Sequence, residues 1–213
     1  MKKVLVVNSS IRSLNSHSRK LTEVFTAHWK KSYDNPVITY RELGNEPVSH
    51  ISENWVNATQ KPEKDRSEAD NEILKSSNVY ISELREADII VLGVPMYNWS
   101  VPSVLKAYID QVLRVNETWE VNREDQKNPY IGLLKNKSLY LLLSRGAQGY
   151  EKGGYNEHMN FQSDYLKTVF NIIGVTDIEE VSVNGEAFGS EEFELARKNS
   201  NARIKELIKT QLL

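Results

Sequence analysis

A loop rich in hydroxyl side chains follows the first apolar run of the chain. Residues Asn8–Ser18 include five serines and no glycine. Short hydroxyl donors and backbone amides at a helix start bind a phosphate group, whose charge the helix dipole favours. Arg12 and Arg19 are expected within reach of such an anion. Without glycine the loop is neither a G-x-G-x-x-G fingerprint nor a Walker loop, so it predicts a site for one phosphate or an ordinary serine cap with solvated arginines.

An aromatic turn, Pro95-Met96-Tyr97-Asn98-Trp99, follows the apolar run Ile89–Val94. The turn carries more aromatic surface than a simple connection requires. Ligands of open α/β sheets bind outside the carboxyl ends of the strands, and this turn falls at such an end. Tyr97 and Trp99 therefore either line a site for a planar ligand or only cover the end of the sheet.

A glycine-rich loop follows a third apolar run. Residues 144–154 contain four of the ten glycines of the chain and follow Ser138–Leu143. Glycines after a buried strand permit close approach of a ligand to the backbone, or unusual dihedral angles. A flexible loop without function is the alternative.

The three loops can form one site only if the strands before them are parallel and end at the same edge of a sheet. Apolar runs rich in β-branched residues are typical of parallel strands that helices cover on both faces. We expect strands over residues 4–7, 37–40, 89–94, 138–143 and 178–183, and helices over 16–30, 71–84, 102–114, 161–173 and 191–212. Ser100 is expected to cap the helix that begins at Pro102. The pattern predicts one α/β domain over residues 1–213, with a five-stranded sheet of order 2-1-3-4-5.

Two polar segments, residues 44–68 and 116–137, show little periodicity. Connections of this length in a compact domain are usually lids or segments that contact a partner. Trp55 lies in the first segment and Trp119 in the second. For Trp55, packing under its own loop is an equally good interpretation.

Composition excludes several classes of function. The 213 residues carry a net charge of -2 and no cysteine. This charge gives no electrostatic footprint for nucleic acid or an anionic membrane. The lack of cysteine excludes disulfides, iron–sulfur clusters and thiolate metal sites, and it fits a reducing cytosol. The apolar run near the N-terminus is too short for a signal peptide, and no segment is long enough to span a bilayer, so we expect a soluble cytoplasmic protein.

The histidines do not indicate a metal site or a hydrolase. The chain has four of them, His17, His28, His50 and His158. Their spacing matches neither a metal-ligand set nor a serine triad, and the G-x-S-x-G motif is absent. Solvated or partly packed side chains are the better interpretation, and we expect no bound metal.

Three segments together resemble a known family, the FMN-dependent NAD(P)H azoreductases, which are also classed with quinone reductases. The segments are SSIRSLNSHSRKL, PMYNWSVPSVLKAYIDQVLR, and SRGAQGY with IIGVTDIEEVSVNG. They span most of the chain and keep their order and spacing. The resemblance implies a flavodoxin-like three-layer sandwich with bound FMN.

The resemblance also implies which residues hold the flavin. Ser10, Ser16 and Ser18, with the backbone of His17, would hold the FMN phosphate. Pro95, Met96, Tyr97, Asn98 and Trp99 would follow the ribityl chain and the isoalloxazine edge, and Ser144, Arg145, Gly146 and Ala147 would approach the pyrimidine end. Family members commonly have a second glycine where Ala147 stands and a phenylalanine where Trp99 stands.

The function that follows is a homodimeric oxidoreductase. FMN carries the hydride chemistry itself, so no catalytic side chain is required. We expect a hydride from NADH or NADPH and two electrons passed to a quinone or an azo compound in alternating half-reactions. Trp119, Phe161 and Trp55 are candidate pocket walls, because flat acceptors stack on aromatic rings. The dimer partner is a possible source of some of them.

Two alternatives stay open. One is a flavodoxin-type electron carrier, a class that is usually strongly acidic on its docking face, unlike a chain with a net charge of -2. The other is a flavin-free descendant that acts as a regulator or binding protein.

Overall fold

The computed structural model describes residues 2–46, 48–189 and 191–211. Its centre is a parallel sheet of five strands in the order β2-β1-β3-β6-β7. The strands are β1 (Lys3–Asn8), β2 (Val37–Glu42), β3 (Ile89–Pro95), β6 (Ser138–Arg145) and β7 (Asp177–Asn184). Counted along the chain, the order of these strands is 2-1-3-4-5, so the expected sheet order is confirmed.

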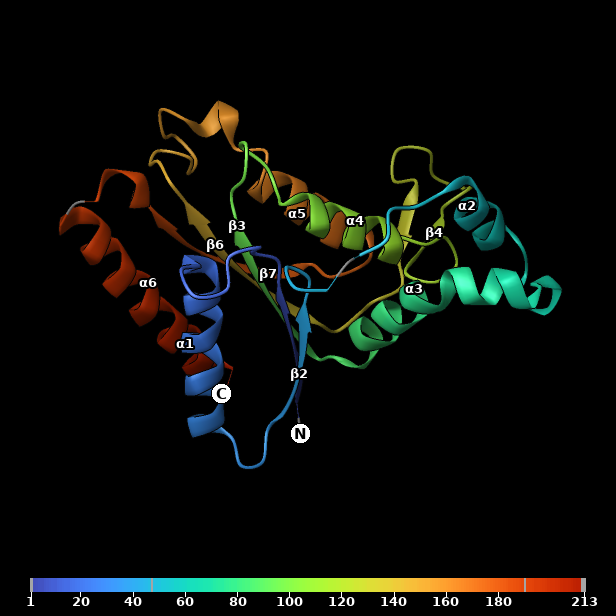
Figure 1. Cartoon of the computed structure of the whole chain (residues 1–213), viewed down its shortest axis with the longest axis horizontal. Helices are drawn as coiled ribbons and strands as arrows, with labels where there is room; N and C mark the ends of the chain where they lie inside the picture. The colour runs from blue at the N-terminus through green and yellow to red at the C-terminus, as the bar shows by residue number, and fades with distance from the viewer. Residues whose placement is uncertain (1, 47, 190, 212–213) are drawn as a thin grey trace.

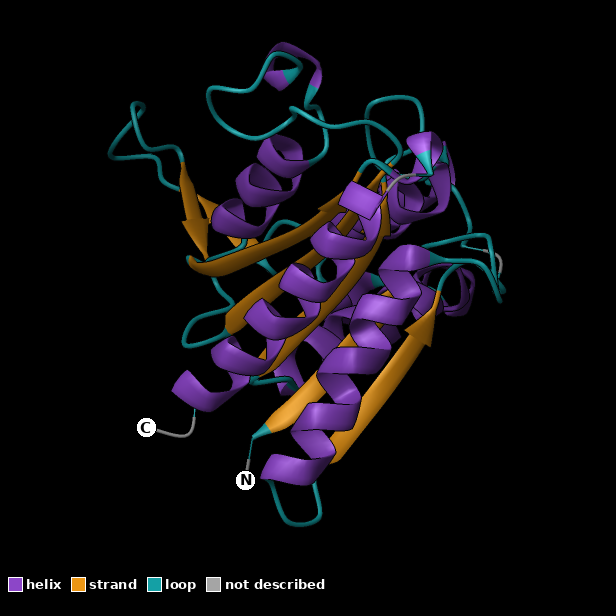
Figure 2. Ribbon diagram, turned by 90° about the vertical axis from the view of Figure 1, so that its left-hand side faces the viewer, coloured by secondary structure: helices purple, strands orange, loops and turns teal. Residues whose placement is uncertain are grey.

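Helices cover both faces of the sheet and form the outer layers of a three-layer sandwich (Figures 1 and 2). The helices α1 (His17–Ser32) and α6 (Glu191–Thr210) cover one face, and α3 (Glu68–Glu86), α4 (Ser103–Val112) and α5 (Ser163–Ile172) cover the other. The expected helix end at Leu212 lies outside the described residues.

Strand β3 shows why its sequence lacks polar alternation. All seven of its residues are buried. Ile89 and Val91 pack in the cluster with α1 and α6, whereas Ile90 and Leu92 pack in the cluster with α3, α4 and α5. Successive side chains of a strand point to opposite faces, and here both faces are covered by helices.

The segment 44–68 is more regular than its sequence indicates. It contains the helix α2 (Glu53–Gln60) and the short turn η1 (Glu63–Asp65). Ser52 caps α2 by accepting a hydrogen bond from the amide of Trp55. Only Trp55 and Ala58 of this helix are buried, against Leu74 of α3. Two apolar contacts are too few to give a helical period. In Figure 1 α2 lies beside α3, at the opposite end of the molecule from α6.

The segment 116–137 contains an antiparallel hairpin of β4 (Trp119–Val121) and β5 (Tyr130–Gly132). The ring of Trp119 packs edge-on against that of Tyr130, with 5.4 Å between centroids. Among the described ranges of the chain, no helix is both long and apolar enough to cross a membrane.

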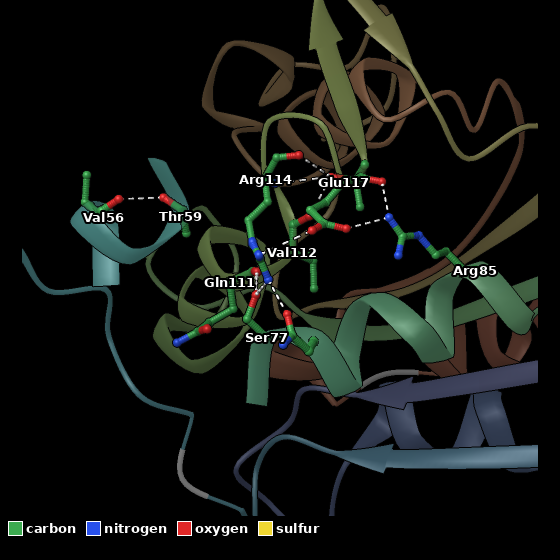
Figure 3. A network of polar contacts seen from close by, with 10 residues as sticks. Val56, Thr59, Ser77, Arg85, Gln111, Val112, Arg114 and Glu117 are labelled. Carbon is green, nitrogen blue, oxygen red and sulfur yellow. Dashed lines mark hydrogen bonds and ion pairs between the residues drawn. The ribbon is translucent and has the colours of Figure 1, made fainter. Parts of the chain in front are cut away.

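Arg114 connects the start of this hairpin segment to the helix α3 (Figure 3). The side chain is 2% exposed, and its Nη1 donates to Ser77 Oγ at 3.0 Å and to Asn78 Oδ1 at 2.6 Å, both on α3. Thr118 Oγ1 donates to the carbonyl of Val112 at 2.6 Å. Buried polar groups that are paired by hydrogen bonds favour one arrangement of the helices and loops to which they belong.

Candidate functional site

The loop between β1 and α1 forms a cluster of buried hydroxyls at a helix start. Ser16 caps α1, and its Oγ accepts from the amide of Arg19 and lies 3.2 Å from Ser18 Oγ. Ser10, Ser16 and Ser18 are all buried. The first amides of a helix, here those of His17 and Ser18, have no carbonyl partner within it. Hydroxyls, free amides and the helix dipole together suit a phosphate group.

Of the two loop arginines, only Arg12 lines the cavity at this helix start. Arg19 instead forms an ion pair with Glu42 at the end of β2. Glu42 also accepts from Asn8 Nδ2 at 2.6 Å. The Arg19 guanidinium is therefore neutralised by a carboxylate of the neighbouring strand and is not part of the cavity lining.

His17 is the first residue of α1 and packs at the mouth of the same cavity. Its ring meets Phe193 edge-on at 4.9 Å, and its Nε2 lies 3.7 Å from Glu186 Oε1. Burial lowers the pKa of His17, and the charge of Lys20 acts in the same direction. His17 is also the first residue of α1, so its backbone amide is among those free to bind an anion.

The turn after β3 holds two residues in the left-handed region. Tyr97 and Ser100 exchange two backbone hydrogen bonds of 3.0 Å, and φ is 48° at Asn98 and 63° at Trp99. Positive φ at both central residues defines a tight hairpin turn that favours Asn and Gly, and a bulky residue there is strained by about 1–3 kcal/mol. The Trp99 side chain is 52% exposed, so burial of its ring does not offset this strain.

Ser100 does not cap α4, contrary to expectation. Pro102 occupies the cap position without a side-chain hydrogen bond, and Ser100 Oγ donates to the carbonyl of Phe161 at 3.4 Å. The paired hydrogen bonds between Ser100 and Tyr97 hold Ser100 in the turn.

Gly146 leaves free space after β6. A Cβ built on it would meet only Ala187 Cβ, at an ordinary contact distance of 3.5 Å, and its φ is not positive. No close packing and no left-handed backbone therefore requires glycine at this position. The missing side chain keeps the cavity wall open to a flat group that approaches the backbone.

The guanidinium of Arg145 points away from this cavity. It is buried, and it donates from Nε to Gln162 Oε1 and from Nη2 to Glu180 Oε1, both at 3.0 Å, and also to Ser163 Oγ. Arg145 can therefore approach a ligand through its backbone and not through its charge.

One cavity brings the three loops together. It is lined by Ser10, Arg12, Asn15, Ser16, His17, Pro95, Met96, Tyr97, Ser144, Arg145, Gly146, Val183, Glu186 and Phe193. The loops also touch directly, because the amide of Met96 donates to the carbonyl of Ser144 at 2.8 Å. Four expected residues lie beside this lining and not in it: Ser18, Asn98, Trp99 and Ala147.

The wall beyond β7 was not predicted from the sequence. Glu186 lies in the short turn η3 (Glu186–Phe188), which left-handed Gly185 and Gly189 flank. Phe193 belongs to α6. Applying the rule for carboxyl ends of strands to β7 as well would have identified this wall.

Of the three aromatic residues expected to form a pocket, only Phe161 lies beside the turn. Its amide donates to the carbonyl of Trp99 at 3.2 Å, and its ring is 62% exposed. It lines a second, open cavity of about 750 Å³. Trp55 and Trp119 line neither cavity. Trp55 is 7% exposed and donates from its ring to Gln111, and Trp119 packs in the hairpin, so a single chain does not bring these two residues together with Phe161.

The donor set fits FMN. The buried serines and free helix amides suit a single phosphate, and the wall at Gly146 suits a flat ring. Strained backbone at Asn98 and Trp99 is typical of a ligand site.

Comparison with known proteins shows the family of the chain. The model of a family with a flavodoxin-like fold matches residues 2–208. FMN-dependent NADH:quinone oxidoreductase 1 of Trichormus variabilis is 38% identical over 98% of this chain and 96% of that protein. FMN-dependent NAD(P)H:quinone oxidoreductase 1 of Pseudomonas aeruginosa is 34% identical over 96% of this chain and 97% of that protein. The crystal structure of an azoreductase from Bacillus anthracis is 26% identical, covers 99% of this chain and 100% of its own, and superposes with a TM-score of 0.88. The chain therefore belongs to the family with this flavodoxin-like fold.

Proposed function

We propose that this protein is an FMN-dependent NAD(P)H oxidoreductase that passes two electrons to quinones and azo compounds. The observation that carries the proposal is the single cavity in which the serine loop, the strained turn and the glycine loop meet. Relatives that match nearly the whole chain are named as FMN-dependent quinone oxidoreductases, and one similar structure as an azoreductase. Bound FMN would supply the hydride and two-electron chemistry, so the residues of the chain need only bind and orient it.

The residues of the cavity bind FMN and orient it. In the proposed complex, Ser10, Ser16 and Ser18 donate to the phosphate together with the amides at the start of α1. The backbone of Ser144–Gly146 faces the pyrimidine end, where preorganised amides stabilise negative charge on a reduced ring. The remaining proposed contacts, those of Pro95–Trp99 and Ala147, lie along the ribityl chain and the ring edge.

Gly146→Ala tests the flat wall of the cavity. We expect FMN affinity to fall roughly tenfold, because the added methyl occupies space that the ring needs. The free energy of unfolding of the FMN-free protein should change by less than about 1 kcal/mol, since the added Cβ meets no protein atom closer than 3.5 Å. Fluorescence titration with FMN and thermal unfolding of the free protein measure both quantities. Unchanged affinity would show that the ring does not lie against this glycine.

Steady-state kinetics test the activity. The FMN-loaded protein should oxidise NADH or NADPH in the presence of menadione and of an azo dye, and the protein freed of FMN should not. An electron carrier would instead stabilise a one-electron form of the flavin during reductive titration. Lack of turnover with both donors and both acceptors would overturn the proposal.

We also propose a homodimer in the cytoplasm. Trp99, Tyr155 and Phe161 are between 52% and 73% exposed, and exposed apolar residues near a site commonly contact a partner. The absence of cysteine fits a reducing compartment. Light scattering during gel filtration should give twice the mass of the chain, and a monomer at micromolar concentration would contradict the dimer.

A further inference from the structure

Gln162, at the start of α5, links the ends of β3 and β6, the strands that lead into the two loops that flank the cavity. It is 0% exposed. Its Nε2 donates to the carbonyl of Val94 at 3.1 Å, and its Oε1 accepts from Arg145 Nε at 3.0 Å. Val94 is the residue before the turn Pro95–Trp99, and Arg145 lies within Ser144–Gly146. One side chain therefore connects both walls of the proposed flavin cavity.

The link needs a carboxamide. Only an amide side chain of this length offers a donor at one terminal atom and an acceptor at the other. A buried amide without partners costs free energy, and here both ends of Gln162 are paired. An apolar residue would fill the same space without forming either contact.

The far end of the link is held firmly. The Arg145 guanidinium also donates to Ser163 and Glu180, and Glu180 Oε2 lies 2.7 Å from Lys167 Nζ. The guanidinium lies 5.9 Å from the centroid of the Tyr150 ring. The Arg145 side chain is thus held by contacts with α5, β7 and Tyr150. Gln162 connects this guanidinium to the carbonyl of Val94 on β3.

We infer that Gln162 is a positioning residue that, together with the backbone pairing of β3 and β6, fixes the spacing between the turn Pro95–Trp99 and the segment Ser144–Gly146 for flavin binding. The inference rests on the proposed function, because the spacing matters only for a ring held between these walls. Gln162 lines neither cavity described above, so it acts through Val94 and Arg145 and not by contact with the ligand.

The chain contains a matched control. Gln111, on α4, is 2% exposed and makes the same two kinds of contact, accepting from Trp55 Nε1 at 3.0 Å and donating to the carbonyl of Ser49 at 2.9 Å. It lies with the Arg114 network, and it is not among the residues that line the flavin cavity (Figure 3). Gln111→Met therefore removes one accepted and one donated hydrogen bond of a buried glutamine elsewhere.

The test compares Gln162→Met with Gln111→Met. Both variants should lower the thermal stability of the free protein by similar amounts. Only Gln162→Met should raise the FMN dissociation constant, by roughly tenfold, and alter the visible circular dichroism of the bound flavin at saturation. An FMN affinity and a dichroism spectrum equal to those of Gln111→Met would overturn the inference.

A second variant keeps the test valid if Gln162→Met does not fold. Gln162→Glu retains an acceptor for Arg145 but as a carboxylate cannot donate to Val94, so it should also weaken FMN binding. Wild-type affinity in Gln162→Glu would overturn the role of the Val94 contact. Failure of the wild-type protein to bind FMN would instead overturn the proposed function.

Discussion

Replacing Ser16 by aspartate is expected to weaken FMN binding at least about 100-fold while the free protein stays folded. Aspartate is as good a helix cap as serine, and its charge is favoured at a helix start. It can therefore accept from the amide of Arg19 as Ser16 does. Two like charges about 4 Å apart near a protein surface repel by roughly 4 kcal/mol, and this repulsion opposes the phosphate.

The measurements for Ser16→Asp are the FMN dissociation constant and the melting temperature of the free protein. The matched control is Ser52→Asp, because Ser52 caps α2 by the same hydrogen bond, to the amide of Trp55. The control should keep wild-type affinity for FMN. If Ser16→Asp bound FMN within about tenfold of the wild type, the phosphate would not lie at the start of α1.

Gly44→Ala is expected to destabilise the protein by about 3 kcal/mol and to weaken FMN binding with it. A Cβ at Gly44 would lie 2.0 Å from the carbonyl oxygen of Ser10 and 2.7 Å from its carbon. Both atoms are backbone, so the loop that carries the Ser10 hydroxyl must move, at a cost typical of overpacking. A loss of this size lowers the melting temperature of a chain of this length by roughly 6–12 °C.

Comparison with Gly146→Ala separates packing from ligand binding. Both changes add one methyl group to a glycine, but only the methyl at Gly44 meets protein backbone. Gly44→Ala should therefore lower both stability and FMN affinity, whereas Gly146→Ala should lower affinity alone. A melting temperature within about 2 °C of the wild type for Gly44→Ala would show that the two loops do not approach so closely.

The sheet could be predicted from sequence because burial on both faces leaves a local signal. Strand β3 is apolar throughout since helices cover both of its faces. The start of α1 could also be predicted, because the Ser16 cap accepts a hydrogen bond from an amide only three residues away in the sequence. The three loops of the site followed from one rule of position, that ligands bind beyond the carboxyl ends of parallel strands.

Contacts between distant residues could not be predicted. Arg19 is a first-turn cation in the sequence, and only the pairing of β2 beside β1 brings Glu42 to it. Gln162 is a single amide at a helix start, and its partner Val94 lies 68 residues away. The sequence alone does not distinguish a buried Trp55 from an exposed one, because its burial depends on the position of α3.

The visible absorption spectrum of the purified protein, before and after addition of NADH or NADPH, tests the central claim most directly. The account predicts a bound flavin spectrum that one of the two donors bleaches in a two-electron step and that menadione restores. A colourless protein whose melting temperature does not rise when FMN is added would contradict it.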